Sequence, residues 1–298
     1  MTAISDTKLQ DALRVFAERF DQSLKRLVVP SDHVPERLRL AVEYAALAPG
    51  KRLRPFLAFQ AANLCGGTYD DVETVAAAIE CIHAFSLTHD DLPAMDDDDL
   101  RRGQLSCHKK FGEATGILAG DALAVFPFEL ITSGAYEPAT AVALVNELAE
   151  ATGWIGMIGG QAADLEGEKQ APDAEIVEYI QLRKTARLIE ASCRLGAIAA
   201  GGTESQQEHL AVFGRNLGMA FQIADDLLDV TAESEALGKA TGKDHAAGKQ
   251  TLVACIGLEE ARQAAVRYSE VATESLAALD GPSEMLAALS RFVVNRTY

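Results

Sequence analysis

Two short segments of the chain carry clustered aspartates next to apolar helical sequence. The first is residues 89–99 (HDDLPAMDDDD) and the second is residues 222–229 (QIADDLLD). Asp225 and Asp229 are four residues apart and therefore share one face of a helix, where two carboxylates repel each other. Hard divalent cations prefer oxygen ligands, and Mg²⁺ usually takes one or two carboxylates together with substrate phosphates. The two segments therefore predict a site for magnesium and a phosphorylated ligand.

A pair of aspartates is by itself a weak signal, because the helix dipole stabilises acidic residues at a helix start. We interpret Asp70 and Asp71, which closely follow the break at residues 66–68, as such a helix start. The two longer acidic segments differ because apolar residues flank both of them. Each also follows an apolar helical run, so we expect each set of carboxylates at the end of a buried helix.

Positive charges gather at four places in this acidic chain. A basic group at a helix N-terminus can bind bare phosphate, although single surface ion pairs contribute little. Acidic clusters for metal and basic clusters for phosphate together predict two phosphorylated ligands, one bound through metal and the other through Lys and Arg. The basic groups are Lys51, Arg52 and Arg54; Arg101 and Arg102; Arg183 and Lys184; and Lys239, Lys243 and Lys249.

The elements that must position these groups are helices. Apolar residues recur three and four apart nearly everywhere, for example at Leu9, Leu13, Phe16, Phe20 and Leu24. No hairpin of alternating β-branched residues is evident, and no shift in composition marks a domain boundary. We therefore expect an all-α fold with one domain over residues 1–298, a single large helical bundle in whose interior facing side chains can build a site.

Composition and charge exclude several classes of function. The 298 residues include 27 Lys and Arg against 44 Asp and Glu, a net charge of −17, which argues against nucleic acid and against anionic membrane surfaces as partners. The five cysteines are scattered without a CxxC pair, which favours a reducing compartment. The N-terminus has no apolar core of a signal peptide, and no apolar run approaches the ~20 residues that span a bilayer. We expect a cytoplasmic protein without stable membrane association.

With these motifs in place, the chain resembles the short-chain trans-prenyl diphosphate synthases, and among them the bacterial farnesyl diphosphate synthases. The resemblance runs from about residue 44 to the C-terminus, and both acidic motifs occur in the family's order. The segments that carry it are GKRLRP (50–55), IECIHAFSLTHDDLPAMDDDDLRRG (79–103), CHKKFGEATGILAGDAL (107–123), GGQAADL (159–165), RKTARLI (183–189), FQIADDLLDV (221–230), and LGKATGKD with AAGKQTLV within 237–253.

The resemblance implies a single large all-α helical bundle around a central cavity, which forms a homodimer. It also implies that the protein condenses isopentenyl diphosphate with an allylic diphosphate, with three Mg²⁺ ions in each active site. It assigns the metal to Asp90, Asp96 and Asp225, with Asp91, Asp226 and Asp229 in support. Contacts to the allylic diphosphate fall on Arg101, Lys184 and Lys239. Contacts to isopentenyl diphosphate fall on Lys51, Arg54, His83 and Arg102, with Lys249 as a further substrate-binding residue. Thr185 and Gln222 match polar groups near the developing cation, and they form the catalytic set together with Lys184 and Lys239.

The resemblance also bears on product length. Phe85 lies five residues before Asp90, about 7.5 Å along a helix at about 1.5 Å per residue, and Ser86 lies four before it. An aromatic residue at the first position resembles the farnesyl synthases, so we predict a fifteen-carbon product. We interpret His89 and His108 as structural residues, and Asp121, Gln161 and Asp164 as supporting or packing residues.

Other functions stay open. A geranyl or geranylgeranyl diphosphate synthase would share every motif and differ only in pocket depth. A terpene cyclase would need no isopentenyl site, so Lys51, Arg54 and the second acidic motif argue against it. An inactive regulatory subunit should have lost acidic-motif residues, and the chain retains those matched above.

Overall fold

The computed structural model describes residues 4–28, 33–167, 173–236 and 251–295, and within these ranges the chain is almost entirely helical. The helices are α1 (Asp6–Leu27), α2 (Glu36–Ala46), α3 (Leu53–Leu64), α4 (Tyr69–Asp90), α5 (Cys107–Phe111), α6 (Glu113–Ser133), α7 (Pro138–Thr152), α8 (Met157–Gly167), α9 (Ala174–Gln181), α10 (Arg187–Ala199), α11 (Glu204–Ala236), α13 (Leu252–Ile256), α14 (Leu258–Ser275) and α15 (Glu284–Asn295). A π-helix, η1 (Leu182–Ala186), joins α9 to α10, and a 3₁₀ turn, η2 (Leu276–Ala278), follows α14.

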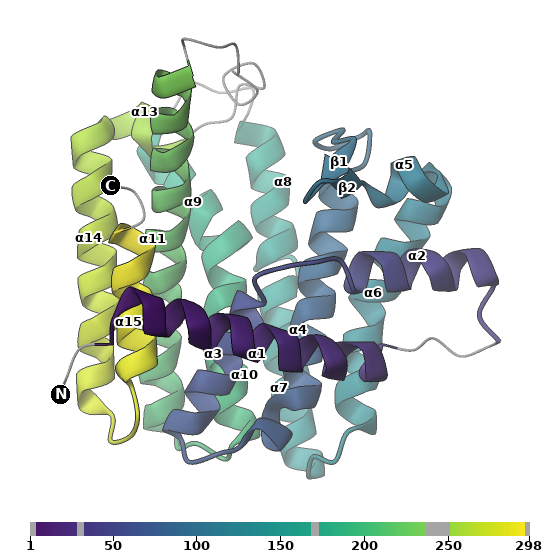
Figure 1. Cartoon of the computed structure of the whole chain (residues 1–298), viewed down its shortest axis with the longest axis horizontal. Coiled ribbons are helices and arrows are strands. Elements are labelled where there is room, and N and C mark those ends of the chain that lie inside the picture. Colours follow the sequence, from purple (N-terminus) through teal and green to yellow (C-terminus); the bar gives the residue numbers. More distant parts are fainter. Residues whose placement is uncertain (1–3, 29–32, 168–172, 237–250, 296–298) are drawn as a thin grey trace.

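The long helices stand side by side as a bundle, and α1 lies across one face of it (Figure 1). Helix α4 packs on α6 and α3, α10 packs on α3 and α11, and α11 packs on α14. The first acidic motif follows α4 directly and lies near the hairpin at the upper end of the bundle in Figure 1. The predicted all-α bundle is confirmed.

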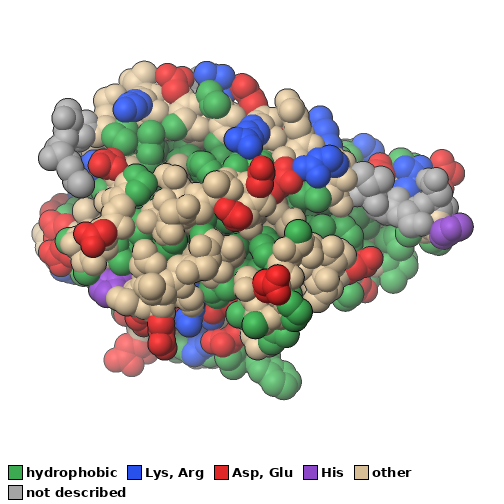
Figure 2. Space-filling model, turned by 90° about the horizontal axis from the view of Figure 1, so that it is seen from below, with side chains coloured by type: hydrophobic (Ala, Val, Ile, Leu, Met, Phe, Trp, Pro, Cys, Tyr) green, Lys and Arg blue, Asp and Glu red, His purple; other side chains and the backbone are tan. Residues whose placement is uncertain are grey.

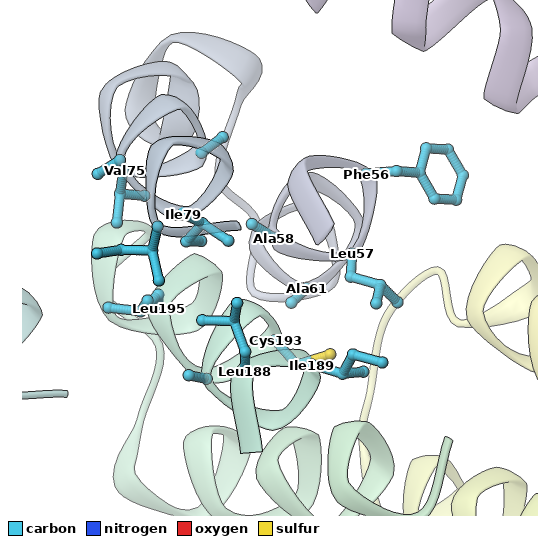
Figure 3. Close-up of a cluster of buried hydrophobic side chains, with 14 of the residues drawn as sticks. Phe56, Leu57, Ala58, Ala61, Val75, Ile79, Leu188, Ile189, Cys193 and Leu195 are labelled. Carbon is cyan, nitrogen blue, oxygen red and sulfur yellow. The ribbon is translucent and has the colours of Figure 1, made fainter. Parts of the chain in front are cut away.

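Helix α3 is buried on nearly every side because it lies between α4 and α10 (Figure 3). Its small residues make this possible: Ala58 faces Ile79 of α4, and Ala61 faces α10. Phe56 points the other way, where its ring meets the ring of Phe16 on α1 at a centroid distance of 5.4 Å. Since the basic segment 50–54 runs into the first turn of α3, this packing holds that segment against the core.

Helix α4 carries the first acidic motif at its C-terminal end. It begins with a capping box in which the Asp71 carboxylate accepts hydrogen bonds from the backbone and the hydroxyl of Thr68, both at 2.7 Å. The interpretation of Asp70 and Asp71 as a helix start is thus confirmed. The helix ends at Asp90, as the sequence predicts.

The structure corrects two expectations about local structure. The second acidic motif does not end a helix, because α11 continues past Asp229 to Ala236. A short antiparallel hairpin also follows the first motif: β1 (Leu100–Arg101) pairs with β2 (Gln104–Leu105). Its turn uses positive φ at Arg102 (53°) and Gly103 (77°), so the Arg-Gly step was the available signal.

Helix α6 also departs from expectation. Among the described residues it alone is long and apolar enough to cross a membrane by length and composition, and 39% of its most apolar window is buried inside the molecule. It packs against α2, α4, α5 and α7 on one side and exposes apolar side chains, among them Leu118 and Val125, on the other. At the end of the bundle away from the acidic motifs, acidic and basic side chains are both scattered across the surface (Figure 2).

Candidate active site

The loop after α4 folds back so that the two predicted metal ligands of the first motif come together. The backbone N–H of Asp96 donates to the carbonyl of Asp90 at 2.9 Å, and Asp97 takes a positive φ of 49° to make this turn. Burial raises the pKa of Asp90 to about 6; the charge of Lys184 opposes this rise, and the charge of Asp96 adds to it. Asp90 and Asp96 thus form an acidic pair that a cation would stabilise.

Asp91 has a different task from its neighbour Asp90. It is buried and accepts a hydrogen bond from Arg101 Nε at 2.8 Å, and the same guanidinium reaches Asp98 at 3.2 Å. This ion pair fastens the β1–β2 hairpin to the end of α4. Asp91 therefore holds the motif in place, which agrees with the supporting role expected for it.

The π-helix η1 carries Lys184 and Thr185 between α8 and α11. π-Helices are rare and frequently occur at functional sites. Both helices approach η1 so closely that they need glycine at the contact. A Cβ on Gly160 of α8 would lie 2.3 Å from the backbone nitrogen of Lys184, and a Cβ on Gly218 of α11 would lie 2.5 Å from Ala186 Cα. Gly160 of the GGQ segment thus lets α8 approach η1 closely.

A chain of hydrogen bonds links η1 to the second acidic motif. The Thr185 hydroxyl donates to Gln222 Oε1 at 2.9 Å, and Gln222 Nε2 donates to Asp226 Oδ1 at 3.1 Å. Gln181 Nε2 donates to the other Asp226 oxygen at 2.8 Å. A carboxylate only accepts hydrogen bonds, so Asp226 fixes the Gln222 amide with its oxygen toward Thr185. The Thr185 proton is then engaged, and the oxygen lone pairs of this hydroxyl remain for the cavity.

Asp226 is buried, which separates it from the other aspartates of its motif. Burial raises its pKa to about 7; the hydrogen bond from Gln222 opposes this rise, and the charges of Asp225 and Asp229 add to it. Asp225 is partly buried and Asp229 is exposed, one turn apart on α11. The motif therefore divides into one inward residue that orients Gln222 and two residues nearer to solvent.

Lys184 lies between acidic groups from two elements. Its ammonium donates to Asp164 Oδ2 of α8 at 2.5 Å, and its charge also acts on Asp90. Asp164, expected to be a supporting or packing residue, thus supports the position of Lys184. The arrangement holds a cation beside Asp90 before any diphosphate arrives.

A cavity of 370 Å³, here called the Asp90 cavity, brings seven of the fifteen predicted site residues together. The predicted residues that line it are Arg54, His83, Phe85, Ser86, Asp90, Lys184 and Thr185. Met157, Ala162 and Leu165 add apolar surface, and Gln161 also lines it. Phe85 precedes Asp90 by five residues on α4, an axial rise of about 7.5 Å between the two backbone positions, and both side chains line the cavity.

The three cations at the start of α3, Lys51, Arg52 and Arg54, lie in different surroundings. Arg52, with a left-handed φ of 49°, is buried and bonds Asp21 at 2.8 Å, Glu80 at 2.6 Å and the Ala48 carbonyl at 2.8 Å. Arg54 lines the Asp90 cavity, whereas exposed Lys51 lines a separate 550 Å³ cavity beside α1 and α15. The structure therefore does not bring Lys51 into the same cavity as Arg54.

Arg54 and His83 form a positively biased wall. Burial lowers the pKa of Arg54 to about 10, Glu80 opposes this, and its Nε is buried without a hydrogen-bond partner. Burial and the nearby charges of Arg54 and Arg102 hold the pKa of His83 well below its usual value. Arg102 donates to the Pro49 carbonyl at 2.6 Å, which ties the hairpin turn to the basic segment. This wall suits an anionic ligand.

The donor set fits magnesium, with substrate completing the coordination. Asp90 and Asp96 supply hard carboxylate oxygens, and burial raises the pKa of Asp90 although Lys184 and Arg101 lie near enough to oppose the rise. Within the described ranges, no three Asp, Glu, His or Cys side chains converge as a metal-holding group. The predicted residues Lys239 and Lys249, together with Lys243, lie outside the described residues.

Comparison with known proteins decides the family. A sequence model described as polyprenyl synthetase matches residues 35–279. The chain belongs to the polyprenyl synthetase family. This family member is 42% identical to the farnesyl diphosphate synthase of Escherichia coli over 294 residues, covering 95% of this chain and 97% of the relative. It is also 44% identical to geranylgeranyl pyrophosphate synthase 11 of Arabidopsis thaliana, covering 88% and 75% of the two chains.

Solved structures agree with the family assignment. An FPP/GFPP synthase from Zymomonas mobilis superposes with a TM-score of 0.83 at 36% identity, covering 96% of this chain and 99% of the other. A geranyltransferase from Legionella pneumophila superposes with a TM-score of 0.86 at 31% identity, covering 98% of each chain. The bundle described above is thus the fold of these polyprenyl synthetase relatives.

Sequence reasoning missed the roles of three residues at this site. Arg52 was grouped with the phosphate-binding cations, but it anchors the loop internally. Gln181 received no role, although it holds Asp226 from the last turn of α9. His89 was interpreted as structural, yet it lines the Asp90 cavity. Only His89 carried a usable signal, because it lies four residues after Phe85 on one helix face.

Proposed function

We propose that this prenyltransferase condenses isopentenyl diphosphate with dimethylallyl or geranyl diphosphate and releases farnesyl diphosphate. The observation that carries the proposal is the Asp90 cavity, which joins Asp90 and Lys184 to the ring of Phe85 across one largely apolar space. Such a cavity suits a ligand with a diphosphate at one end and a hydrocarbon chain at the other. The 42% identity to the Escherichia coli farnesyl diphosphate synthase supports the same product.

The proposed cofactor is Mg²⁺, three ions in each site, held by Asp90, Asp96 and Asp225. When bound, it neutralises the charge that develops on the leaving diphosphate. Lys184 and Arg101 complement that charge from the protein side, and both are already fixed by carboxylates. This is electrostatic stabilisation by groups that need no reorganisation during the reaction.

The remaining residues position the two substrates. Arg54, His83 and Arg102 form the wall for isopentenyl diphosphate, while Lys51, Lys239 and Lys249 are proposed as further substrate contacts. Cleavage of the allylic C–O bond leaves an allylic cation, toward which the Thr185 oxygen presents its lone pairs because its proton is donated to Gln222. The isopentenyl double bond then attacks the cation, the new C–C bond forms, and a proton leaves to the released diphosphate. Apolar walls exclude the water that would otherwise capture the cation.

A geranylgeranyl product is the second candidate. Relatives from Arabidopsis thaliana named geranylgeranyl pyrophosphate synthases are 42–44% identical to this chain, as similar as the Escherichia coli farnesyl diphosphate synthase. The residues that hold diphosphate and metal would be the same for both products. The depth of the Asp90 cavity below Asp90 would decide between them.

The experiment is a product assay. Purified protein is incubated with Mg²⁺, isopentenyl diphosphate and, separately, dimethylallyl, geranyl or farnesyl diphosphate, and products are resolved by chain length. We expect fifteen-carbon product from the first two starters and no extension of farnesyl diphosphate. Efficient extension to twenty carbons would support the prenyltransferase activity but would make geranylgeranyl diphosphate, rather than farnesyl diphosphate, the product. No condensation, in an assay where a known synthase works, would favour the inactive-subunit alternative.

We also propose that the protein is a homodimer and that it is located in the cytoplasm. Apolar side chains are exposed on α6 and α7, which pack against each other, and in the turn before α8: Leu118 and Val125 on α6, Val142 on α7, and Trp154 and Ile155 in the turn. Exposed apolar groups of this kind mark association surfaces. The five free cysteines and the bacterial relative support a cytoplasmic location.

The single tryptophan makes the dimer testable, because Trp154 is 88% exposed in the single chain. If a second copy covers it, its fluorescence should be blue-shifted at micromolar concentration and should shift red on dilution. Analytical ultracentrifugation would report the mass directly. A monomeric mass together with solvent-exposed tryptophan emission at all concentrations would exclude the homodimer.

A further inference from the structure

His89 occupies the last turn of α4, one residue before Asp90, and reaches across to α6. Its Nε2 lies 3.0 Å from the backbone carbonyl of Ile117. A carbonyl oxygen only accepts, so Nε2 carries the proton and donates it to Ile117. The imidazole is therefore fixed in one orientation by the backbone of a neighbouring helix.

The space for this imidazole exists because residue 120 has no side chain. A Cβ on Gly120 would lie 2.1 Å from both Cδ2 and Nε2 of His89, far closer than any van der Waals contact allows. Gly116, one turn earlier on α6, faces a different residue, since its Cβ would lie 3.1 Å from His108 Cβ. Glycine inside a helix costs stability, so a specific fit at Gly120 explains its presence there.

The imidazole also packs against Phe85. The two rings lie 5.0 Å apart between centroids at an interplanar angle of 77°, an edge-to-face pair. Both side chains line the Asp90 cavity, and Phe85 is buried. The imidazole thus contacts both the α6 backbone and the Phe85 ring, and both rings face the cavity.

We propose that His89 and Gly120 are positioning residues that set the length of the product by fixing the Phe85 ring at the end of the cavity. The inference rests on the proposed function and adds to it a determinant on α6. Without a support behind it, the Phe85 ring could rotate toward α6 and make way for a growing chain in the cavity. With His89 held between Gly120 and Phe85, the ring has no space to withdraw toward α6.

Two substitutions at this contact should change product length in opposite directions. His89→Ala removes the support behind Phe85, so the ring can withdraw and the ratio of twenty- to fifteen-carbon product should rise about three- to tenfold, the range of an edge-to-face pair. Gly120→Ala pushes the imidazole away from α6 toward Phe85 and the cavity. The ratio of ten- to fifteen-carbon product should then rise about threefold.

Three further variants separate this role from a general effect on packing. His89→Gln keeps an N–H donor for the Ile117 carbonyl without a ring against Phe85, so it should lengthen products as His89→Ala does. The double variant His89→Ala/Gly120→Ala has no imidazole to displace, so the ten-carbon accumulation should vanish. Gly116→Ala is the matched control on the same helix, and its product length should equal that of the wild type.

The assay uses the full-length protein with Mg²⁺, isopentenyl diphosphate and dimethylallyl diphosphate, and circular dichroism checks that each variant is folded. Wild-type product lengths in both folded His89 variants and in Gly120→Ala would overturn the inference and leave the proposed function intact. If His89→Ala does not fold, His89→Gln decides in its place. A wild type that forms no prenyl diphosphate would overturn the proposed function and this inference with it.

Discussion

The guanidinium of Arg52 and the carboxylate of Glu80 form an ion pair of 2.6 Å inside the bundle, with side chains only 2% and 5% exposed. Arg52 is the residue before α3, and Glu80 lies in the middle of α4. The pair thus fixes the basic segment to the helix that carries the first acidic motif. On either side of the buried Arg52, Lys51 and Arg54 line different cavities.

Replacing Arg52 should lower both stability and the affinity for isopentenyl diphosphate. Arg52→Met leaves Glu80 buried without a partner, which costs about 3–5 kcal/mol in the free energy of unfolding. The segment also loses its hold on Asp21 and the Ala48 carbonyl. Urea denaturation measures the first effect, and a raised KM for isopentenyl diphosphate with an unchanged KM for the allylic substrate measures the second.

The double variant Arg52→Met/Glu80→Leu separates the two effects. An apolar pair of similar volume removes the unpaired charge, so stability should return close to that of the wild type. The KM should stay raised, because nothing then holds the basic segment in its left-handed turn at residue 52. A normal KM in this variant would show that the ion pair serves stability only.

Asp226→Asn should slow the reaction without weakening substrate binding. An asparagine offers one acceptor oxygen where Gln181 and Gln222 both donate, so the Gln222 amide and then Thr185 would lose their fixed orientation. Misplacement on this scale can reduce kcat about tenfold to a hundredfold. Steady-state kinetics should show both KM values and the Mg²⁺ requirement near those of the wild type. Asp225→Asn is the contrast, since it should raise the Mg²⁺ requirement.

Phe85→Ala should lengthen the product. The substitution removes the ring from the end of the Asp90 cavity and lets the chain grow past fifteen carbons. Chromatography of the dephosphorylated products measures the ratio of twenty- to fifteen-carbon alcohols. Ser86→Ala, the neighbour on the same wall, removes only a hydroxyl that bonds the His83 carbonyl and should leave the ratio unchanged. An unchanged spectrum for Phe85→Ala would place the end of the cavity elsewhere.

His83 should make the protein less stable in acid. Its folded-state pKa lies well below the usual value of about 6.5, so below pH 6.5 the unfolded chain binds a proton that the folded protein does not. Stability then falls as pH falls, by up to about 1.4 kcal/mol per pH unit. Urea denaturation at pH 7.5, 6.5 and 5.5 should show a shallower loss for His83→Gln than for the wild type. Parallel curves would mean that His83 titrates normally.

The helical bundle could be predicted from the sequence because periodicity is a property of each segment by itself. The end of α4 at Asp90 and the helix start at Asp70 and Asp71 follow from local signals. The continuation of α11 past Asp229 also agrees with local sequence, since no glycine or proline lies between residues 229 and 236 to stop the helix; the expected helix end at this motif is therefore wrong.

The division of labour within the site depends on contacts that local sequence does not contain. Nothing in the segment KRLR shows that Arg52, rather than Arg54, turns inward, since the partners Asp21 and Glu80 lie about thirty residues away on either side. Likewise, nothing in the aspartate pairs 90–91 and 225–226 indicates that the second member of each pair, Asp91 or Asp226, is an internal anchor. Tertiary partners decide such roles.

The π-helix η1 has a consequence for how this chain can change in length. Compared with an α-helix, η1 holds one extra residue between Leu182 and Ala186, and each residue of an α-helix turns the chain by about 100°. A single deletion here would relax the segment into continuous α-helix and rotate Lys184 and Thr185 away from Asp164 and Gln222. Loops elsewhere on the surface tolerate insertion and deletion. In η1, by contrast, the number of residues matters as much as their identities, because a change in length would displace Lys184 and Thr185.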